Sequence, residues 1–227
     1  MPEFQIYNTD YREVLARILE NGPVDAAVFD PPYVIDTRGG GKYRKKRPML
    51  NRIEKQNLHK GFNLEILSWK TANQIICFCS DEQIVPVKAR LQQGFHRAIL
   101  CQFHKKNPQP VANKHRRPDT EFFIHAWQKG WHPVGTLQDK SRWMMASRPE
   151  RFPFINSDGE EDNHPTIKPL SVMQWIMRTL QGDIVIDPFM GTGTTGVAAL
   201  QAGKRFIGAE IVPEYFQIAE QRLSEVA

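Results

Sequence analysis

The tetrapeptide Asp30-Pro31-Pro32-Tyr33 places a carboxylate, a stiff turn and an aromatic ring directly after the apolar run at 24–29. The run ends there because a proline offers no N–H to a sheet and fixes its own φ. The carboxylate and the Pro31 carbonyl can accept both hydrogens of an amine on a heteroaromatic ring, while Tyr33 stacks on that ring. Such contacts make the amine nitrogen a better nucleophile. The alternative is a plain strand and turn with Tyr33 as a core or lid aromatic, and the motif alone leaves both open.

A second set of candidates lies in the segment Asp187-Pro188-Phe189-Met190-Gly191-Thr192-Gly193-Thr194-Thr195-Gly196. It is typical of a glycine-rich turn between a strand and a helix, where a ligand approaches the backbone. The glycine spacing fits GxGxxG and leaves a dinucleotide open, whereas a P-loop is excluded because no Gly-Lys-Ser/Thr follows. The threonines and Asp187 suit a smaller nucleoside that carries an amino acid. Glu210, about 20 residues on, is placed to accept from ribose hydroxyls.

Two segments combine features that suit a polyanion. Residues 38–60 open on three glycines and hold nine Lys or Arg against Glu54 alone. Such a run is often only a solvated face, but its place after Tyr33 favours a loop that neutralises phosphates. Residues 129–163 mix aromatic rings with arginines, which suits nucleic-acid contacts or, equally, a loop-rich subdomain with a small core. The candidate DNA-binding residues are Lys42, Arg44, Lys45, Lys46, Arg47, Arg116, Arg117 and Arg142.

Composition describes an ordinary globular protein. The chain has 227 residues, 41% hydrophobic and 24% charged, with a net charge of +5, and one α/β domain is the natural expectation. The three cysteines lie in apolar stretches without zinc-site spacing, so we expect reduced core thiols, no metal site and a cytoplasmic protein. The first ten residues lack the pattern of a signal peptide, and no apolar run is long enough to span a bilayer.

The elements that must position these residues alternate along the chain. Periodicity predicts helices at 10–21, 64–70, 81–94, 170–180 and 213–223, and strands at 24–29, 74–79, 95–103, 121–127, 183–187 and 205–209. Alternating strands and helices indicate an α/β fold with a mostly parallel sheet and helices on both faces. Ligands bind such sheets at the carboxyl ends of the strands, where Asp30 and Asp187 are expected.

Taken together, the motifs resemble those of the DNA amino-methyltransferases that depend on S-adenosylmethionine. The resemblance rests on the turn at Asp30–Tyr33, the loop at Asp187–Gly196, Glu210 and the segment His164–Pro169, and it covers most of the chain outside 38–60 and 129–163. The catalytic turn precedes the cofactor loop, which is similar to the β group, a circularly permuted form of the Rossmann-like sheet. The resemblance implies a single methyltransferase domain over 1–227, with a basic loop insertion at 38–60 and a small target-recognition region at 129–163.

The resemblance also implies roles for individual residues. Asp30 and the Pro31 carbonyl orient the amine of a base flipped out of double-stranded DNA, Pro32 shapes the turn and Tyr33 stacks on the base. The residues implied at S-adenosylmethionine are Asp187, Phe189, Gly191, Thr192, Gly193, Thr194, Thr195, Glu210 and Lys168, the last of which could instead be a structural cap.

Asp at the first position of the turn leans in this family toward adenine, so we expect N6-adenine methylation, with N4-cytosine as the alternative. A nicotinamide-dependent oxidoreductase and a non-catalytic DNA-binding module remain open as other classes of function. We further expect a bacterial or phage protein, a possible homodimer, and any restriction enzyme on a separate chain.

Overall fold

The computed structural model describes residues 3–32, 62–108, 116–147, 152–155, 161–163 and 167–227. Its centre is a sheet with the strand order β1-β10-β9-β2-β3-β5-β4-β6. The strands are β1 (Phe4–Tyr7), β2 (Val24–Phe29), β3 (Ala72–Cys79), β4 (Arg97–Lys105), β5 (Thr120–Trp127), β6 (Trp143–Ala146), β9 (Ile184–Asp187) and β10 (Arg205–Ala209). A separate antiparallel pair consists of β7 (Pro153–Ile155) and β8 (Glu161–Asn163).

Five α-helices and two short 3₁₀ turns are described. They are α1 (Tyr11–Asn21), η1 (Leu64–Ile66), η2 (Asp81–Gln83), α3 (Ile84–Gly94), α4 (Leu170–Met177), α5 (Thr194–Gln201) and α6 (Pro213–Ser224). The predicted α1 is confirmed, and the Asp10 side chain caps it by accepting from Arg12 N. The predicted helix at 64–70 is wrong, because the segment forms only a single 3₁₀ turn and then bends into β3.

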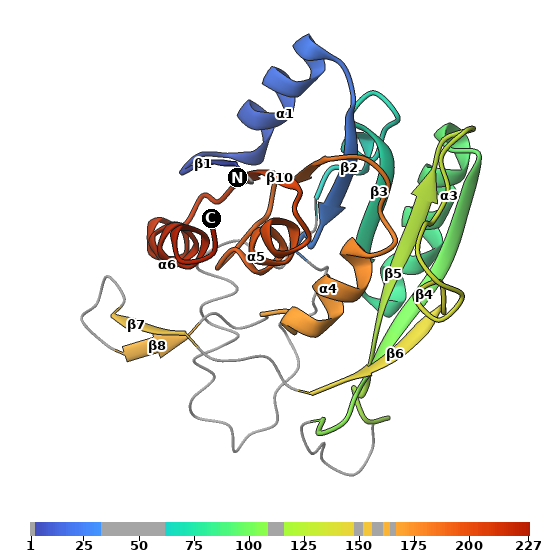
Figure 1. Cartoon of the computed structure of the whole chain (residues 1–227). Helices are drawn as coiled ribbons and strands as arrows, with labels where there is room; N and C mark the ends of the chain where they lie inside the picture. The colour runs from blue at the N-terminus through green and yellow to red at the C-terminus, as the bar shows by residue number, and fades with distance from the viewer. Residues whose placement is uncertain (1–2, 33–61, 109–115, 148–151, 156–160, 164–166) are drawn as a thin grey trace, which may run out of the picture.

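The sheet is mostly parallel, as predicted, and β5 is the exception. It runs antiparallel to both β3 and β4, while every other neighbouring pair in the sheet is parallel. Helices α4, α5 and α6 cover one face, and α1 and α3 cover the other (Figure 1). The prediction of an α/β fold with helices on both faces is therefore confirmed. No described helix has the length and apolar character needed to cross a membrane.

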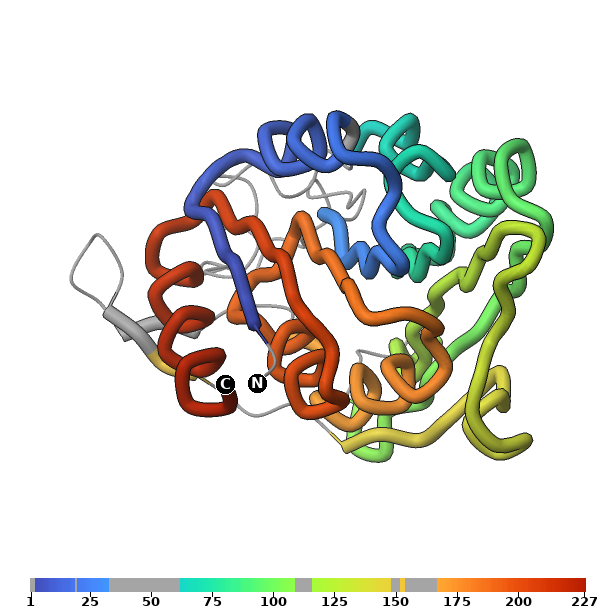
Figure 2. Tube along the Cα trace, turned by 45° about the horizontal axis from the view of Figure 1, so that its top comes forward, coloured from blue at the N-terminus to red at the C-terminus, as the bar shows by residue number. Residues whose placement is uncertain are grey.

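The apolar runs that predicted strands are buried on both faces, as central parallel strands require. In β2, Ala26 and Val28 pack toward α4 and α5, whereas Ala27 and Phe29 pack toward α1 and α3. Figures 1 and 2 both show β1 and α6, from opposite ends of the described chain, close together. The amino-terminal strand thus pairs with β10 and completes the half of the sheet that the carboxyl-terminal segment builds.

The order of the strands reverses between β2 and β9. From β2 the chain continues to β3 on one side, and from β9 it continues to β10 on the other, so the two following loops diverge. A crevice at the carboxyl ends of the strands opens at such a switch point. The turn at Asp30–Pro32 and the loop that begins at Asp187 both lie at this point.

The close approach of α5 to its neighbours requires a glycine at position 196. A Cβ there would lie 2.6 Å from Phe206 Cε1 and 2.7 Å from Leu223 Cδ2. We expect Gly196→Ala to lower the free energy of unfolding by about 1–3 kcal/mol, because these core side chains must move.

Gly94→Ala is the matched control, since this helical glycine would place its Cβ no closer than 3.5 Å to Trp69. Urea denaturation of both variants measures the difference. Equal stability of the two variants would contradict the close packing of α5.

Candidate active site

Two aspartates occupy adjacent strand ends at the switch point. Strands β2 and β9 pair in parallel through Ala26 with Val185 and Ala27 with Ile186. Asp30 is the first residue after β2, and Asp187 is the last residue of β9. The charge of Asp30 is close enough to raise the pKa of Asp187. The structure therefore brings together the two motifs that lie far apart in the sequence.

Asp187 is the more buried of the pair, with 1% of its surface exposed. Burial is the main reason that the pKa of its carboxyl is raised to about 7. Hydrogen bonds from the Thr195 hydroxyl and the Phe189 backbone N–H lower the pKa, whereas the negative charges of Asp30 and Glu210 raise it. The Phe189 N–H donates to Oδ1 at 2.9 Å. The charged groups that act on this carboxyl are thus both negative. A cation placed against Asp187 would offset the cost of burying its charge.

Glu210 follows β10 and holds the other side of the glycine turn. Its Oε2 accepts from Gly191 N at 2.9 Å, and its Oε1 accepts from Val212 N at 2.8 Å. Burial raises the pKa of the Glu210 carboxyl to about 7 even though these backbone N–H groups lower it. The carboxylate fixes the glycine turn, and each of its oxygens keeps a second lone pair for an incoming hydroxyl.

The turn from Met190 to Gly193 depends on two glycines with positive φ. Gly191 has φ 54° and Gly193 has φ 79°, values that favour glycine over residues with a Cβ. A Cβ on Gly193 would also lie 3.0 Å from the Ala219 Cβ of α6. The turn delivers the chain into the amino terminus of α5, where Thr194 and Thr195 are the first two residues.

Arg222 of α6 holds two of the predicted cofactor residues from behind. Its Nη1 donates to the backbone oxygen of Thr192, and it lies 3.3 Å from Thr192 Oγ1 and 3.2 Å from Thr194 Oγ1. The same guanidinium lies 4.0 Å above the ring of Phe152. Arg222 was not singled out from the sequence, because nothing local to α6 indicates a contact with the glycine turn.

Phe189 forms an aromatic wall on the side of α1. Its ring centroid lies 4.8 Å from that of Tyr11, 6.3 Å from that of Phe29 and 6.2 Å from that of Phe62. Such tilted and edge-on pairs stabilise one another, so the ring is held in place by three other segments. The predicted cofactor residues Asp187, Phe189 and Glu210 therefore surround one turn.

Asp30 is part of a chain of ion pairs in which Lys168 is buried and the other members are partly exposed. Lys168 Nζ lies 2.7 Å from Asp30 Oδ1 and 3.5 Å from Glu121 Oε2, and Lys105 Nζ lies 2.7 Å from Glu121 Oε1. Lys168 is only 5% exposed, and its ammonium also lies 5.2 Å from the centroid of Phe78. Lys168 thus contacts Asp30, the catalytic candidate. Glu121 and Lys105 were missed from the sequence, because only the antiparallel pairing of β4 and β5 brings them here.

The remaining predicted residues are distributed as follows. Pro31 is buried and Pro32 is half-buried, beside Asp30. Arg116 and Arg117 are exposed just before β5, whose first residues lie at the same edge of the sheet as Asp30. Arg142 is also exposed, but it lines a cavity against α4 whose walls do not include Asp30 or Asp187. Tyr33, Lys42, Arg44, Lys45, Lys46 and Arg47 lie outside the described residues.

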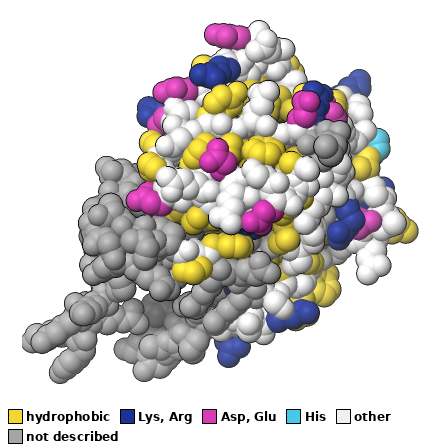
Figure 3. All heavy atoms as spheres, turned by 60° about the vertical axis from the view of Figure 1, so that its left-hand side comes forward, with side chains coloured by type: hydrophobic (Ala, Val, Ile, Leu, Met, Phe, Trp, Pro, Cys, Tyr) yellow, Lys and Arg dark blue, Asp and Glu magenta, His cyan; other side chains and the backbone are white. Residues whose placement is uncertain are grey.

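The described residues on the face shown in Figure 3 carry charges of both signs. There, Lys and Arg side chains are interspersed with Asp and Glu among apolar and polar groups. The described Lys and Arg side chains are therefore not gathered into a patch on that face. Among the described residues, no group of three or more His, Cys, Asp or Glu side chains could hold a metal ion.

Comparison with protein-family models gives a match to the family described as DNA methylase, over residues 24–221. Among curated proteins, the type II methyltransferase M2.MboI of Moraxella bovis is 33% identical over 252 residues, covering 98% of this chain and 88% of that protein. The type II methyltransferase M2.LlaDCHI of Lactococcus lactis subsp. cremoris is 44% identical over 153 residues, 60% of this chain and 54% of that protein.

Two further likenesses extend these matches. The DNA adenine methyltransferase YhdJ of Escherichia coli (strain K12) is 46% identical over 66 residues, 28% of this chain and 22% of that protein. The chain thus matches about half or less of the length of some curated relatives, as with M2.LlaDCHI at 54%. Among solved structures, the M1.HpyAVI–SAM complex superposes with a TM-score of 0.69 at 28% identity, covering 97% of this chain and 99% of that one.

The raised pKa of Asp187 makes stability depend on pH. The folded carboxyl has a pKa of about 7 against the ordinary aspartate value of 3.8, so the folded state binds a proton that the unfolded state releases. The free energy of unfolding of the wild type therefore falls as pH rises through this window, and the loss is complete above the folded pKa. Asp187→Asn removes the titration. We expect the variant to gain stability over the wild type between pH 5 and pH 8, by about 2–4 kcal/mol.

Thermal or urea unfolding at the two pH values measures this gain. Asp81→Asn, at an exposed aspartate after β3, reports what the loss of a surface carboxylate does by itself. A stability difference for Asp187→Asn that is the same at both pH values would show that this carboxyl does not titrate in the window.

Proposed function

This chain belongs to the family of DNA methylases, and we propose that it transfers a methyl group from S-adenosylmethionine to the exocyclic amine of a base in DNA. The observation that carries the proposal is the placement of Asp30 and Asp187 side by side at the switch point of the sheet. One end of the crevice then holds the donor, and the other holds the amine that accepts the methyl group.

The residues around the glycine turn fit S-adenosylmethionine, which supplies a methyl group activated on a sulfonium sulfur. Asp187 is a buried carboxyl whose charged neighbours are negative, so the ammonium group of the methionine portion satisfies it. Glu210 keeps acceptor capacity for ribose hydroxyls beyond its two backbone bonds. The backbone of Gly191 and Gly193 permits close approach, and Phe189 lines the cleft from the side of α1.

Asp30 accepts the hydrogens of the target amine, together with the backbone carbonyl of Pro31. Lys168 anchors this carboxylate through Oδ1 at 2.7 Å and is itself held by Glu121. A fixed carboxylate costs no reorganisation when the nitrogen develops positive charge during methyl transfer. These contacts support a positioning role for Lys168 at Asp30. Tyr33, which follows the turn, stacks on the base, which must leave the duplex to reach the crevice.

Adenine is the base that we favour, and the amine is its N6. The Asp at the first position of the turn leans that way in the resembling family, and YhdJ carries the name of a DNA adenine methyltransferase. Transfer to N4 of cytosine is the alternative within the same chemistry. A homodimer and a restriction enzyme on a separate chain remain predictions.

The experiment that tests this proposal measures methyl transfer from labelled S-adenosylmethionine to duplex DNA, followed by mass analysis of the released nucleosides. We expect N6-methyladenine as the product. Asp30→Ala should lower the rate roughly 100-fold or more, because the amine loses an oriented acceptor. Calorimetric binding of S-adenosylmethionine by that variant should persist, since Asp187 and Glu210 are unchanged.

Asp81→Ala is the control, because this exposed aspartate follows the neighbouring strand β3 and leaves the crevice intact. Unchanged activity of Asp30→Ala would overturn the catalytic assignment. N4-methylcytosine as the product would correct the base and leave the mechanism standing.

The exposed arginines before β5 lie at the edge where DNA must approach, and the basic residues at 42–47 are proposed to share this role. Arg117→Glu should weaken DNA binding several-fold and reduce the slope of log K against log salt by about 1 for each lost phosphate contact. Lys70→Glu makes a similar charge change at an exposed residue just before β3, at the opposite edge of the sheet, and serves as the control. Equal affinities and slopes for the two variants would remove Arg117 from the DNA interface.

A further inference from the structure

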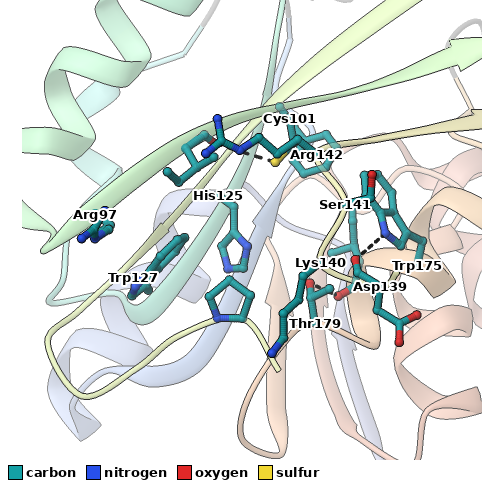
Figure 4. A pocket seen from close by; sticks show the side chains of 14 residues that line it. Arg97, Cys101, His125, Trp127, Asp139, Lys140, Ser141, Arg142, Trp175 and Thr179 are labelled. Atoms are coloured by element: carbon teal, nitrogen blue, oxygen red, sulfur yellow. Dashed lines mark hydrogen bonds between the residues drawn. The ribbon is translucent and has the colours of Figure 1, made fainter. Parts of the chain in front are cut away.

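A second cavity lies against the other end of β5, away from Asp30. It has a volume of about 310 Å³ and lies between strands β4 and β5 on one side and α4 with the segment 133–142 on the other. This volume is at the lower end of the range for small-molecule sites. Figure 4 shows the side chains of His125, Trp127, Trp175 and Thr179 around it.

The position separates this cavity from the crevice. Trp127 is in register with Gln74 in the amino-terminal half of β3, and His125 is in register with Ile76 near the middle of that strand. Asp30 and Lys168 lie beyond the carboxyl ends of the strands, beside Glu121 at the start of β5. Neither the glycine turn nor the Asp30 turn contributes to the walls of the cavity.

The walls suit a planar ring. Trp175 packs edge-on against Phe123 with ring centroids 5.6 Å apart, and His125 packs edge-on against Trp127 at 5.1 Å. Trp175 Nε1 donates a hydrogen bond to the backbone oxygen of Asp139 at 2.8 Å, and this bond fixes the orientation of the indole. Rigid aromatic walls of this kind present flat apolar surface at low entropic cost to an aromatic guest.

His125 supplies an unmet hydrogen bond. It is 5% exposed, and within the described part of the chain its Nε2 is buried without a hydrogen-bond partner. Burial lowers the pKa of this imidazole to about 3, so the ring is neutral and offers one donor and one acceptor nitrogen. A buried polar atom without a partner is costly, and a ligand that meets it recovers that cost.

Cations surround the opening. Arg97, Lys140 and Arg142 are exposed members of the lining. Burial raises the pKa of the Cys101 thiol to about 11, and the positive charge of Arg142 acts in the opposite direction. Arg142 therefore lies close to Cys101. Asp139 brings a negative charge to the same wall, but its carboxylate is bound by Arg178 at 2.8 Å and by the Thr136 hydroxyl at 2.6 Å. The unbalanced charge at the opening is therefore positive.

We propose that this cavity binds a small heteroaromatic acid, with its ring between the aromatic walls, a ring N–H on His125 and its carboxylate or phosphate at the cationic opening. This site is additional to the methyl-transfer crevice, and it does not depend on the proposed function.

Calorimetry with indole-3-acetate as the probe tests the proposal on the full chain saturated with S-adenosylmethionine. We expect binding, and we expect 1-methylindole-3-acetate, which lacks the ring N–H, to bind about tenfold more weakly. In His125→Phe the difference between the two probes should vanish, because the acceptor is gone while a ring still fills the position. His96→Phe makes the same change at an exposed histidine outside the cavity and should keep the difference.

Arg97→Gln tests the cationic opening without changing the core, because this side chain is exposed. It should weaken indole-3-acetate several-fold and leave neutral 3-methylindole unchanged. Circular dichroism confirms that each variant is folded. The proposal fails if indole-3-acetate does not bind at millimolar concentration, if S-adenosylmethionine displaces it, or if His125→Phe and Arg97→Gln both bind it as the wild type does.

Discussion

The parallel pairing of β2 with β9 is the constraint on which the rest of the structure depends. It brings the carboxyl ends of two strands, and with them Asp30 and Asp187, to adjacent positions. Glu210 enters the same region from β10, so three carboxyl groups gather at one edge of the sheet. Negative charges this close and this buried oppose folding. Their arrangement is understandable only if groups of opposite charge, within the chain or brought by a ligand, share the crevice.

The chain compensates these carboxyls unequally. Asp30 is paired with Lys168, whose ammonium is held in turn by Glu121 and Phe78. Glu210 receives two backbone N–H bonds, and Asp187 receives one backbone and one hydroxyl bond. Hydrogen bonds alone leave the pKa of both Asp187 and Glu210 raised to about 7. The cost of burial is therefore greatest at Asp187 and Glu210, the two carboxyls that we propose to bind the cofactor, and a cationic group beside them would offset it.

Sequence reasoning reached what is encoded locally. The prolines after β2, the glycines at 191 and 193 and the apolar strand patterns act over a few residues, so the sheet, its edge and the two motifs could be predicted. The contacts of Lys168, Glu121 and Arg222 could not, because each joins segments that only the folded sheet brings together. The helix predicted at 64–70 failed for a related reason. Its apolar residues Leu64, Ile66 and Leu67 pack from a single turn against the core beneath α3, and no longer helix is needed to bury them.

Strand β5 contributes side chains to the crevice at one edge of the sheet and to the second cavity toward the other edge, and its antiparallel direction decides which residues lie where. Because it runs against β3 and β4, its first residues lie at the edge of the crevice, where Glu121 holds Lys168. Its last residues lie at the opposite edge, where His125 and Trp127 line the second cavity. Helix α4 follows the same path, since it begins two residues after Lys168 and places Trp175 and Ile176 on that cavity. A parallel strand would have reached the crevice with its carboxyl end and left His125 without the neighbours that now surround it.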